Sequence, residues 1–567
     1  MSLQRSKRTG GLVARPEDER RRLSVYHLVG LAAGGVIGSG WLIGPGKAYE
    51  RAGSYAWLSW LLGGLLTLLI AWVMVELGTA APKTGGLVFL PLQSSGPLVA
   101  TVVAAGLWIL YAANAAGEAI AMTNGLAWKF PGLHDPARTP YWICTVAFTA
   151  LICAVNLLVP RIFFAFNSAL TVAKVAVPVL TCVLLLVSAS QLDGTGVSAR
   201  HPQPSVSGAL AAVVDGGVIF AYVGFQGPLD FAGNIKRRGM GESARLRWAV
   251  FGTIVGSTAL YTALQFVYGN HVGPLTGNSL QTPWGQFAMA AQMNVLLWVI
   301  QIDAVASPMG AGLVFAHSLT REVAALSRAH LTHRGLQTSR NASLRGRYDV
   351  YWLVLLVDFV VGVVMLVAFR GDWGSLTSVI GVLALVVYAV PGVVLVALGD
   401  RLPECSSGRR RLRVGLAVLA FVLIGLILYL AGEGNVLRAM ATLAAGCVLL
   451  LGLPVLSRRR PALGRFYDAK EHVTAFREWR ARPAAQAALV LIGYLLALLL
   501  FTVWGSTGRT AKISGGCLVV VAACAAFWGL VVLSNRYMSE VAPLLPRPAD
   551  WATQAGPSRT PVSAASE

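Results

Sequence analysis

Long apolar segments separated by short polar loops dominate this chain of 567 residues. A helix needs about 20 apolar residues to cross the hydrocarbon core of a bilayer. Counted in this way, the pattern predicts an all-α polytopic membrane protein with about fourteen transmembrane helices. The predicted spans are residues 26–48, 54–79, 97–127, 141–159, 163–188, 208–233, 248–270, 287–320, 350–369, 375–399, 412–432, 434–456, 485–505 and 513–534.

Two of these spans contain helix-breaking glycines near mid-depth. The first span holds Gly34–Gly40 (GGVIGSG), and the sixth holds Gly216–Gly233 (GGVIFAYVGFQGPLDFAG). Unwound backbone is tolerated at this depth only where protein or a cavity, rather than lipid, surrounds it. A pair of broken helices, one in each half of a chain, indicates the substrate site of a secondary transporter.

The order of the spans predicts an internal repeat. Each broken helix is the first of five, and an odd number of helices inverts the second copy relative to the first. We therefore expect a five-plus-five inverted-repeat transporter fold with extra C-terminal helices. The predicted segments are a cytoplasmic basic tail (1–24), a ten-helix transport core (25–400), two additional helices (401–456), a cytoplasmic basic loop (457–486), two C-terminal helices (487–536) and a disordered cytoplasmic tail (537–567).

The composition and the placement of charge support a membrane protein. Hydrophobic residues make up 56% of the chain and charged residues 13%, against roughly 25% charged residues in soluble proteins. Basic residues cluster in alternate loops such as 236–247 and 401–413, whereas 270–286 has none. This alternation follows the positive-inside rule and predicts both termini in the cytoplasm of a multi-pass cell-membrane protein. Basic arms that bind nucleic acid would not alternate in this way, so no nucleic-acid partner is expected.

The first break has the chemistry to hold both ends of a zwitterion. Amide N–H groups freed at the start of the outer half-helix would point at a carboxylate. Carbonyl groups freed at the end of the inner half-helix, around Val36 and Ile37, would point at an ammonium group. One site that binds both ends indicates an α-amino acid. The alternative is that the glycines only allow close helix packing, which is common in membranes.

Ionisable side chains inside the spans are costly and are functional candidates by default. Lys174 stands alone among apolar residues of the fifth span. Because burial disfavours a charged amine, Lys174 could exchange a proton; the alternative is a permanently charged structural tether. The other candidate proton carriers are the carboxylates of Asp303, Asp230 and Glu118.

The remaining candidates have more ordinary interpretations. Glu76, near the inner end of the second span, is expected to be a cytoplasmic gate or a loop anchor. Asp358 is expected near a span end, where its carboxylate reaches water. The seven cysteines form no Cys-x-x-Cys pair, so we expect neither a metal site nor a disulfide.

Three motifs together resemble those of the amino acid–polyamine–organocation (APC) permeases, over roughly residues 24 to 400. They are Gly34–Pro45 (GGVIGSGWLIGP), Glu76–Gly86 (ELGTAAPKTGG) and Phe220–Phe225 (FAYVGF). Within this family, Phe225–Gly233 and Asp303–Gly310 look most similar to bacterial aspartate–proton symporters. The resemblance implies the five-plus-five fold shared with sodium-coupled amine and amino acid transporters.

The resemblance also implies roles for the residues at the breaks. Amides of Ser39 and Gly40 would meet the substrate carboxylate, and Phe220 would be an aromatic gate. Carbonyls of Ile37, Phe220 and Val223 would meet the amine. The full set of implied substrate-binding residues is Ile37, Gly38, Ser39, Gly40, Phe220, Ala221, Val223, Gly224 and Gln226.

Lys174 matches the position of a lysine that takes the place of a sodium ion in sodium-independent relatives. The resemblance implies that Lys174 bridges a first-span carbonyl near Gly35 or Val36 to the eighth span, where Ser307 is the expected partner. Gln226 stands where some relatives carry a glutamate thought to sense protons, so that mechanism is not expected here.

Together these features predict a secondary active permease that takes up an amino acid with protons by alternating access. An acidic substrate such as aspartate is favoured and a neutral one remains open; selectivity would come from side chains such as Tyr111, Phe220 and Gln226. The alternatives are an amino acid exchanger and a transporter-like nutrient sensor. A membrane enzyme is not expected, because no external loop carries clustered acids, histidines or metal ligands. The expected coupling ion is a proton, with no cofactor.

Overall fold

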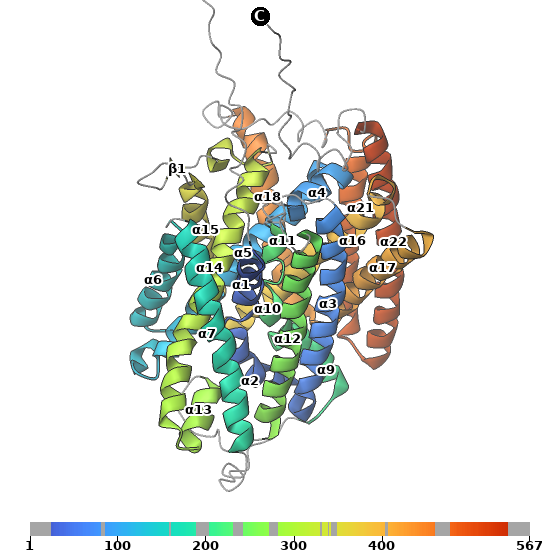
Figure 1. Cartoon of the computed structure of the whole chain (residues 1–567). Helices are drawn as coiled ribbons and strands as arrows, with labels where there is room; N and C mark the ends of the chain where they lie inside the picture. The colour runs from blue at the N-terminus through green and yellow to red at the C-terminus, as the bar shows by residue number, and fades with distance from the viewer. Residues whose placement is uncertain are drawn as a thin grey trace, which may run out of the picture.

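The computed structural model describes residues 24–80, 86–157, 160–188, 203–230, 242–270, 282–328, 331–337, 340–341, 349–402, 406–459 and 477–541. These residues form a bundle of α-helices (Figure 1). The helices of the first repeat and the broken span of the second are α1 Val25–Val36, α2 Gly40–Ala52, α3 Ala56–Ala80, α4 Gly86–Ser95, α5 Pro97–Leu126, α6 Thr139–Val155, α7 Pro160–Val187, α9 Val206–Asp215, α10 Val218–Tyr222 and α11 Gly227–Asp230.

The second half of the chain is also helical. Its helices are α12 Glu242–Asn270, α13 Pro283–Ala290, α14 Asn294–Arg328, α15 Trp352–Ala368, α16 Trp373–Ala397, α17 Ser407–Leu430, α18 Glu433–Arg459, α21 Pro483–Gly505 and α22 Arg509–Val541. Short 3₁₀ turns are η2 Gly53–Tyr55, η3 Pro131–Leu133, η6 Arg334–Gln337 and η7 Gly399–Arg401. Two strands of two residues each, β1 Arg340–Asn341 and β2 Asp349–Val350, pair in antiparallel fashion.

The all-α membrane fold is confirmed. Among the described residues, ten helical segments are long and apolar enough to cross a membrane, and α6, α9 and α15 are shorter apolar helices. The number of crossings therefore stays a prediction. Several helices extend beyond the predicted spans: α12 begins at Glu242 rather than residue 248, α14 continues to Arg328, past the predicted end at residue 320, and α22 runs to Val541, past residue 534. Most of the predicted tails and of the 457–486 loop lies outside the described residues.

The packing of the two halves matches an inverted repeat. Helix α3 packs along α12, and α5 packs along α14, so the second and third helices of each half lie against their counterparts (Figure 1). The later helices α17, α18, α21 and α22 cover one side of this core and contact it through α16, α5 and α4. Helices α4 and α13 lie at opposite ends of the bundle, and we call these the α4 end and the α13 end (Figure 1).

The two predicted breaks are present. Helix α1 ends at Val36, Ile37 is extended (φ −88°, ψ 91°), and α2 begins at Gly40. The sixth span is interrupted twice, at Gly217 (φ 73°) and at Gly224 (φ 115°). Both angles lie in the left-handed region, which glycine adopts without strain.

The breaks touch each other through bare backbone. A Cβ atom on Gly224 would lie 2.8 Å from Gly35 Cα, and a Cβ on Gly35 would lie 3.0 Å from Gly224 Cα. Any side chain at Gly224 would also meet an unfavourable φ, so only glycine satisfies both requirements. Glycine at these positions therefore brings two unwound segments into direct contact in the core.

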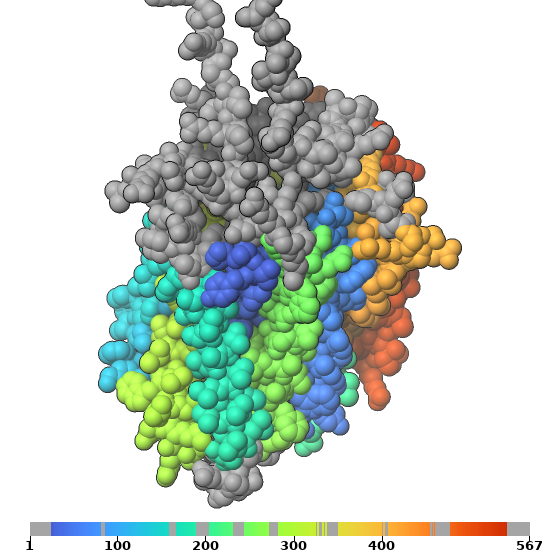
Figure 2. All heavy atoms as spheres, in the orientation of Figure 1, coloured from blue at the N-terminus to red at the C-terminus, as the bar shows by residue number. Residues whose placement is uncertain are grey.

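Helix α7 covers this core on one side. Its outer surface is visible beside α12 in Figure 2, and its most exposed side chains are apolar, including Val172, Val183 and Val187. An exposed apolar face on a polytopic protein is the face that lipid covers. Lys174 lies on the same helix but is fully buried, so α7 directs its one mid-span cation inward.

Glu76 ties three helices together at the α4 end. Its carboxylate accepts from Arg247 of α12 at 3.2 Å and from Arg409 of α17 at 2.8 Å. Arg413 of α17 adds a contact at 2.9 Å. The expected gate or loop anchor is therefore, in the structure, a helix anchor that fastens α17 to the core.

We expect Glu76→Gln to destabilise the protein by on the order of 2 kcal/mol, because three arginines lose their shared counter-charge. This is less than the typical cost of breaking a buried ion pair, since Arg247 and Arg409 are 42% and 46% exposed. Thermal unfolding of the purified protein, followed by size-exclusion chromatography, measures the loss. Glu50→Gln is the control, because Glu50 pairs with Lys47 on the surface. Equal stability of the two variants would contradict the anchor.

Candidate functional site

The first break binds a carboxylate supplied by the protein itself. The backbone amide of Ser39 donates to Glu118 Oε2 of α5 at 2.8 Å, in a fully buried contact. A side chain on Gly38 would collide with the same carboxyl group and with Ala311 of α14. The amide that we expected to hold the substrate carboxylate thus holds Glu118, and Gly38 leaves room for it.

The carbonyl groups of the break are also occupied. Tyr261 of α12 donates to Val36 O at 3.0 Å, and Ser307 of α14 donates to Ile37 O at 3.3 Å. Ser307 therefore reaches the first span as expected, although it holds a different carbonyl from Lys174.

Lys174 binds the inner half-helix, α1, at Gly34, which precedes Val36 and Ile37 along the chain. Its Nζ donates to Gly34 O at 2.6 Å, rather than to the carbonyl of Gly35 or Val36. A Cβ on Gly310 of α14 would lie 2.9 Å from Lys174 Nζ, so the ammonium group rests against the backbone of the eighth span. Lys174 thus lies between α1 and α14, the two helices that the resemblance implies, but it binds Gly34 O and no hydrogen bond joins it to Ser307 among the described residues.

Two carboxylates balance this buried cation. Lys174 interacts electrostatically with Glu118 and with Asp303, and all three side chains are at most 3% exposed. If all three were ionised, the cluster would carry a net charge of −1 in a region of low dielectric. One proton on either carboxylate makes it neutral, which lowers the cost of burial.

A second polar cluster lies at the second break. The amide of Gly224 donates to Gln226 Oε1 at 2.9 Å, and Gln226 Nε2 donates to the hydroxyl of Tyr111 at 3.3 Å. Tyr111 in turn donates to Asp230 Oδ2 at 2.9 Å. Gln226 and Asp230 are thus connected in one chain of hydrogen bonds that begins at the unwound backbone.

The expected aromatic gate packs across the first break. The ring of Phe220 meets Trp373 of α16 edge-on, with centroids 5.5 Å apart, and Trp373 Nε1 donates to the hydroxyl of Ser39 at 3.1 Å. Ala221 lies against Gly40, where a Cβ would be 2.8 Å from Ala221 Cα. The carbonyl of Phe220 accepts the amide of Val223.

Helix α5 joins the two clusters. Glu118 and Tyr111 are seven residues apart on this helix, which places them about 10 Å apart along its axis and on one face. The structure therefore brings Glu118, Lys174, Asp303 and Ser307 together at the first break, and Gln226 and Asp230 at the second.

The sequence did not reveal every residue of the site. Trp373 and Tyr261 resemble ordinary interfacial or core aromatics. Glu322 lies past the predicted end of the eighth span and was therefore counted in a basic loop. Asp358 was placed near water, but it is 2% exposed in the middle of α15 and faces Cys153 Sγ at 3.9 Å; that expectation was wrong.

Several known proteins are similar to this chain over most of its length. An aspartate–proton symporter of Bacillus subtilis is 26% identical over 86% of this chain and 91% of its own length. A glutamate/serine transporter, AimA, of the same organism is 27% identical over 92% of this chain and 95% of its own. Among solved structures, a manganese transporter of Eremococcus coleocola matches 80% of this chain and 99% of its own with a TM-score of 0.47 and 14% identity.

A family model described as amino acid permease matches residues 23–453. The match covers the broken spans, both polar clusters and most of the described helices. This chain therefore belongs to the amino acid permease family.

Proposed function

We propose that this permease imports an amino acid together with protons by alternating access. The observation that carries the proposal is the hydrogen bond from the Ser39 amide to Glu118 beside Lys174. An unwound backbone amide in a membrane core is a site for a carboxylate, and here an ionisable protein group occupies it.

Competition for the Ser39 amide would couple substrate to protons. An ionised Glu118 accepts from the amide and repels a second carboxylate. A protonated Glu118 is neutral and releases the amide to the substrate. Protonation therefore favours substrate binding, so uptake should rise as the pH on the entry side falls.

Lys174 would keep the cluster independent of sodium. Its ammonium group holds Gly34 O between α1 and α14, in the place where the resemblance puts a sodium ion in other transporters. The carboxylates of Glu118 and Asp303 balance its charge. A proton moving among these three groups would change how firmly the inner half-helix is held.

The burial of the site supports alternating access. Ser39, Phe220 and Ile37 are at most 3% exposed, so no amino acid reaches them without movement of the surrounding helices. The positive-inside rule favours the α4 end as the cytoplasmic one, because Arg247, Arg409 and Arg413 gather there. Net import would then pass from the α13 end to the α4 end of the bundle in the cell membrane.

The names of the relatives support a proposal for the class of substrate. One is named for aspartate and another for glutamate and serine. An acidic side chain needs donors to offset its desolvation, and the amide of Gln226 and the hydroxyl of Tyr111 are donors at the second break. We therefore favour acidic amino acids over neutral ones.

Uptake into proteoliposomes tests this function. We expect a pH gradient, acidic outside, to drive accumulation of aspartate or glutamate from a radiolabelled panel, with no requirement for sodium. Uptake that needs a preloaded amino acid and ignores the pH gradient would indicate an exchanger instead. Uptake driven by sodium would contradict the role of Lys174.

Glu118→Gln tests the competition for the Ser39 amide. Because glutamine is permanently neutral, we expect substrate affinity to lose its pH dependence. In the unmodified protein, affinity should fall about tenfold between about pH 5.5 and about pH 8, a typical coupling between two ligands. Isothermal titration calorimetry in detergent, repeated at each pH, measures the substrate affinity of the variant and of the unmodified protein. A variant that keeps the full pH dependence would exclude Glu118 as the coupling group.

A further inference from the structure

Two carboxyl groups lie close together in the core, and neither belongs to an ion pair within the described part of the chain. Asp230 ends α11, and Glu322 lies in the last two turns of α14; they are 0% and 1% exposed. Helix α11 packs on α14, and the two carboxyl groups interact electrostatically. Among the ion pairs of the described residues, none includes either group.

Hydrogen-bond donors of the described residues satisfy only one of the four oxygen atoms of this pair. Tyr111 donates to Asp230 Oδ2, but within the described part of the chain Asp230 Oδ1 and both oxygens of Glu322 receive no hydrogen bond. Two ionised carboxylates are acceptors only and cannot bond to each other. In a buried site like charges also oppose double ionisation. A proton between the two groups resolves both problems at once.

Within the described residues, the titratable groups near the pair lie on three helices. The phenols of Tyr111 on α5 and Tyr388 on α16 face Asp230, and both are neutral donors. Arg321 precedes Glu322 on α14, but its guanidinium lies over the ring of Tyr351, 5.8 Å from the centroid. His317 lies on the same helix and interacts electrostatically with Arg321.

The pair is connected to the substrate site. Gly224 N donates to Gln226, Gln226 donates to Tyr111, and Tyr111 donates to Asp230. Every group in this chain donates in the same direction, so each bond polarises the next. Gly224 in turn lies on Gly35 of the first break. A change of charge on Asp230 would therefore alter the hydrogen bond at Gly224 and, through the contact with Gly35, the environment of both unwound segments.

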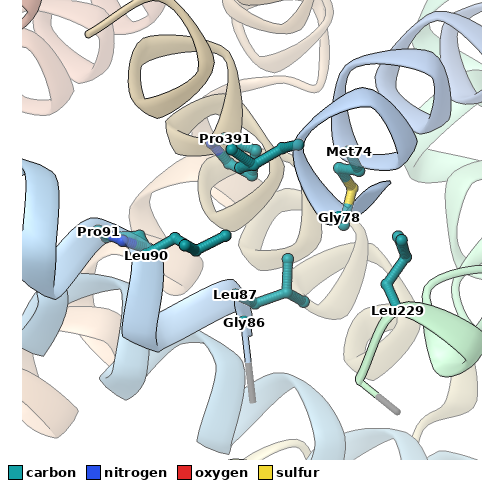
Figure 3. A pocket seen from close by; sticks show the side chains of 9 residues that line it. Met74, Gly78, Gly86, Leu87, Leu90, Pro91, Leu229 and Pro391 are labelled. Atoms are coloured by element: carbon teal, nitrogen blue, oxygen red, sulfur yellow. The ribbon is translucent and has the colours of Figure 1, made fainter. Parts of the chain in front are cut away.

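An apolar cavity lies next to the end of α11 that carries Asp230. It measures about 20 Å³ and lies between α3, α4, α11 and α16, beside Leu229, the residue before Asp230 (Figure 3). It has room for about one water molecule, but its lining is apolar, including Met74, Leu87 and Leu229. This lining offers the acid pair no polar partner.

We propose that Asp230 and Glu322 form a proton-binding site that holds one shared proton and releases it toward the α4 end during transport. In the release step, the O–H bond of the shared proton breaks, water at the α4 end takes the proton, and the pair changes from a charge of −1 to −2. The site rests on the proposed proton-coupled import and adds a second proton position to it, separate from Glu118 and Lys174.

Infrared spectroscopy of the purified protein tests the shared proton without any transport. At neutral pH we expect a carbonyl band of one protonated carboxyl group in the difference spectrum between the unmodified protein and Glu322→Gln, and an equal band for Asp230→Asn; any proton held by Glu118 or Asp303 cancels in these differences. Each variant gives the remaining carboxylate an amide donor, so it no longer needs the proton. Difference spectra without this band for both variants would overturn the site, and a band for only one would assign the proton to a single carboxyl group and overturn the sharing.

Transport assays then test its role. We expect Glu322→Gln to lose about tenfold in pH-driven accumulation, a coupling of ordinary size, while counterflow exchange without a gradient stays close to that of the unmodified protein. Asp358→Asn is the matched control, because Asp358 is equally buried but lies on α15. If the unmodified protein ignores the pH gradient, proton-coupled import fails, whatever the spectra show. If it responds and both acid-pair variants respond equally, only the acid pair fails as a coupling site.

Discussion

A helix broken inside a membrane frees amide and carbonyl groups that water cannot reach, so the protein must satisfy them itself. In this permease three freed groups at the first break have side-chain partners from other helices. Glu118 of α5 takes the Ser39 amide, Tyr261 of α12 takes Val36 O, and Ser307 of α14 takes Ile37 O. Three helices thus hold one unwound segment, and their movement relative to it changes which of its groups are available.

The same requirement explains why charges lie in the core. A neutral donor would satisfy Gly34 O, but Lys174 brings a full charge there and needs Glu118 and Asp303 to balance it. Such a group is costly in a purely structural role, since a buried cation loses its hydration. The cost becomes useful when the number of protons in the cluster changes during a transport cycle.

The sequence predicted the breaks and Lys174 because each violates a strong local rule. Glycines in an apolar span and a lone lysine among valines stand out without any tertiary information. Trp373 and Tyr261 could not be found in this way, since membrane helices contain many aromatics and only contacts distinguish these two. Glu322 was missed for another reason: hydropathy ends the eighth span where charges begin, whereas α14 continues because α11 and α5 still pack against it.

Helix α4 is another element that hydropathy alone did not predict. Its ten residues are too short to span a bilayer, so hydropathy treated them as part of a loop. In the fold they form one wall of the apolar cavity beside Leu229.

The contact between Gly35 and Gly224 sets how the two polar clusters act together. Bare backbone at this crossing leaves no flexible side chain to absorb movement, so displacement of one break displaces the other. Glu118 binds the first break, and hydrogen bonds through Gln226 and Tyr111 connect the second break to Asp230. Under the proposed mechanism, a carboxylate that binds at Ser39 would change the environment of both clusters through the contact between the two breaks. A substrate recognised mainly by backbone groups would in this way govern protons held by side chains elsewhere in the core.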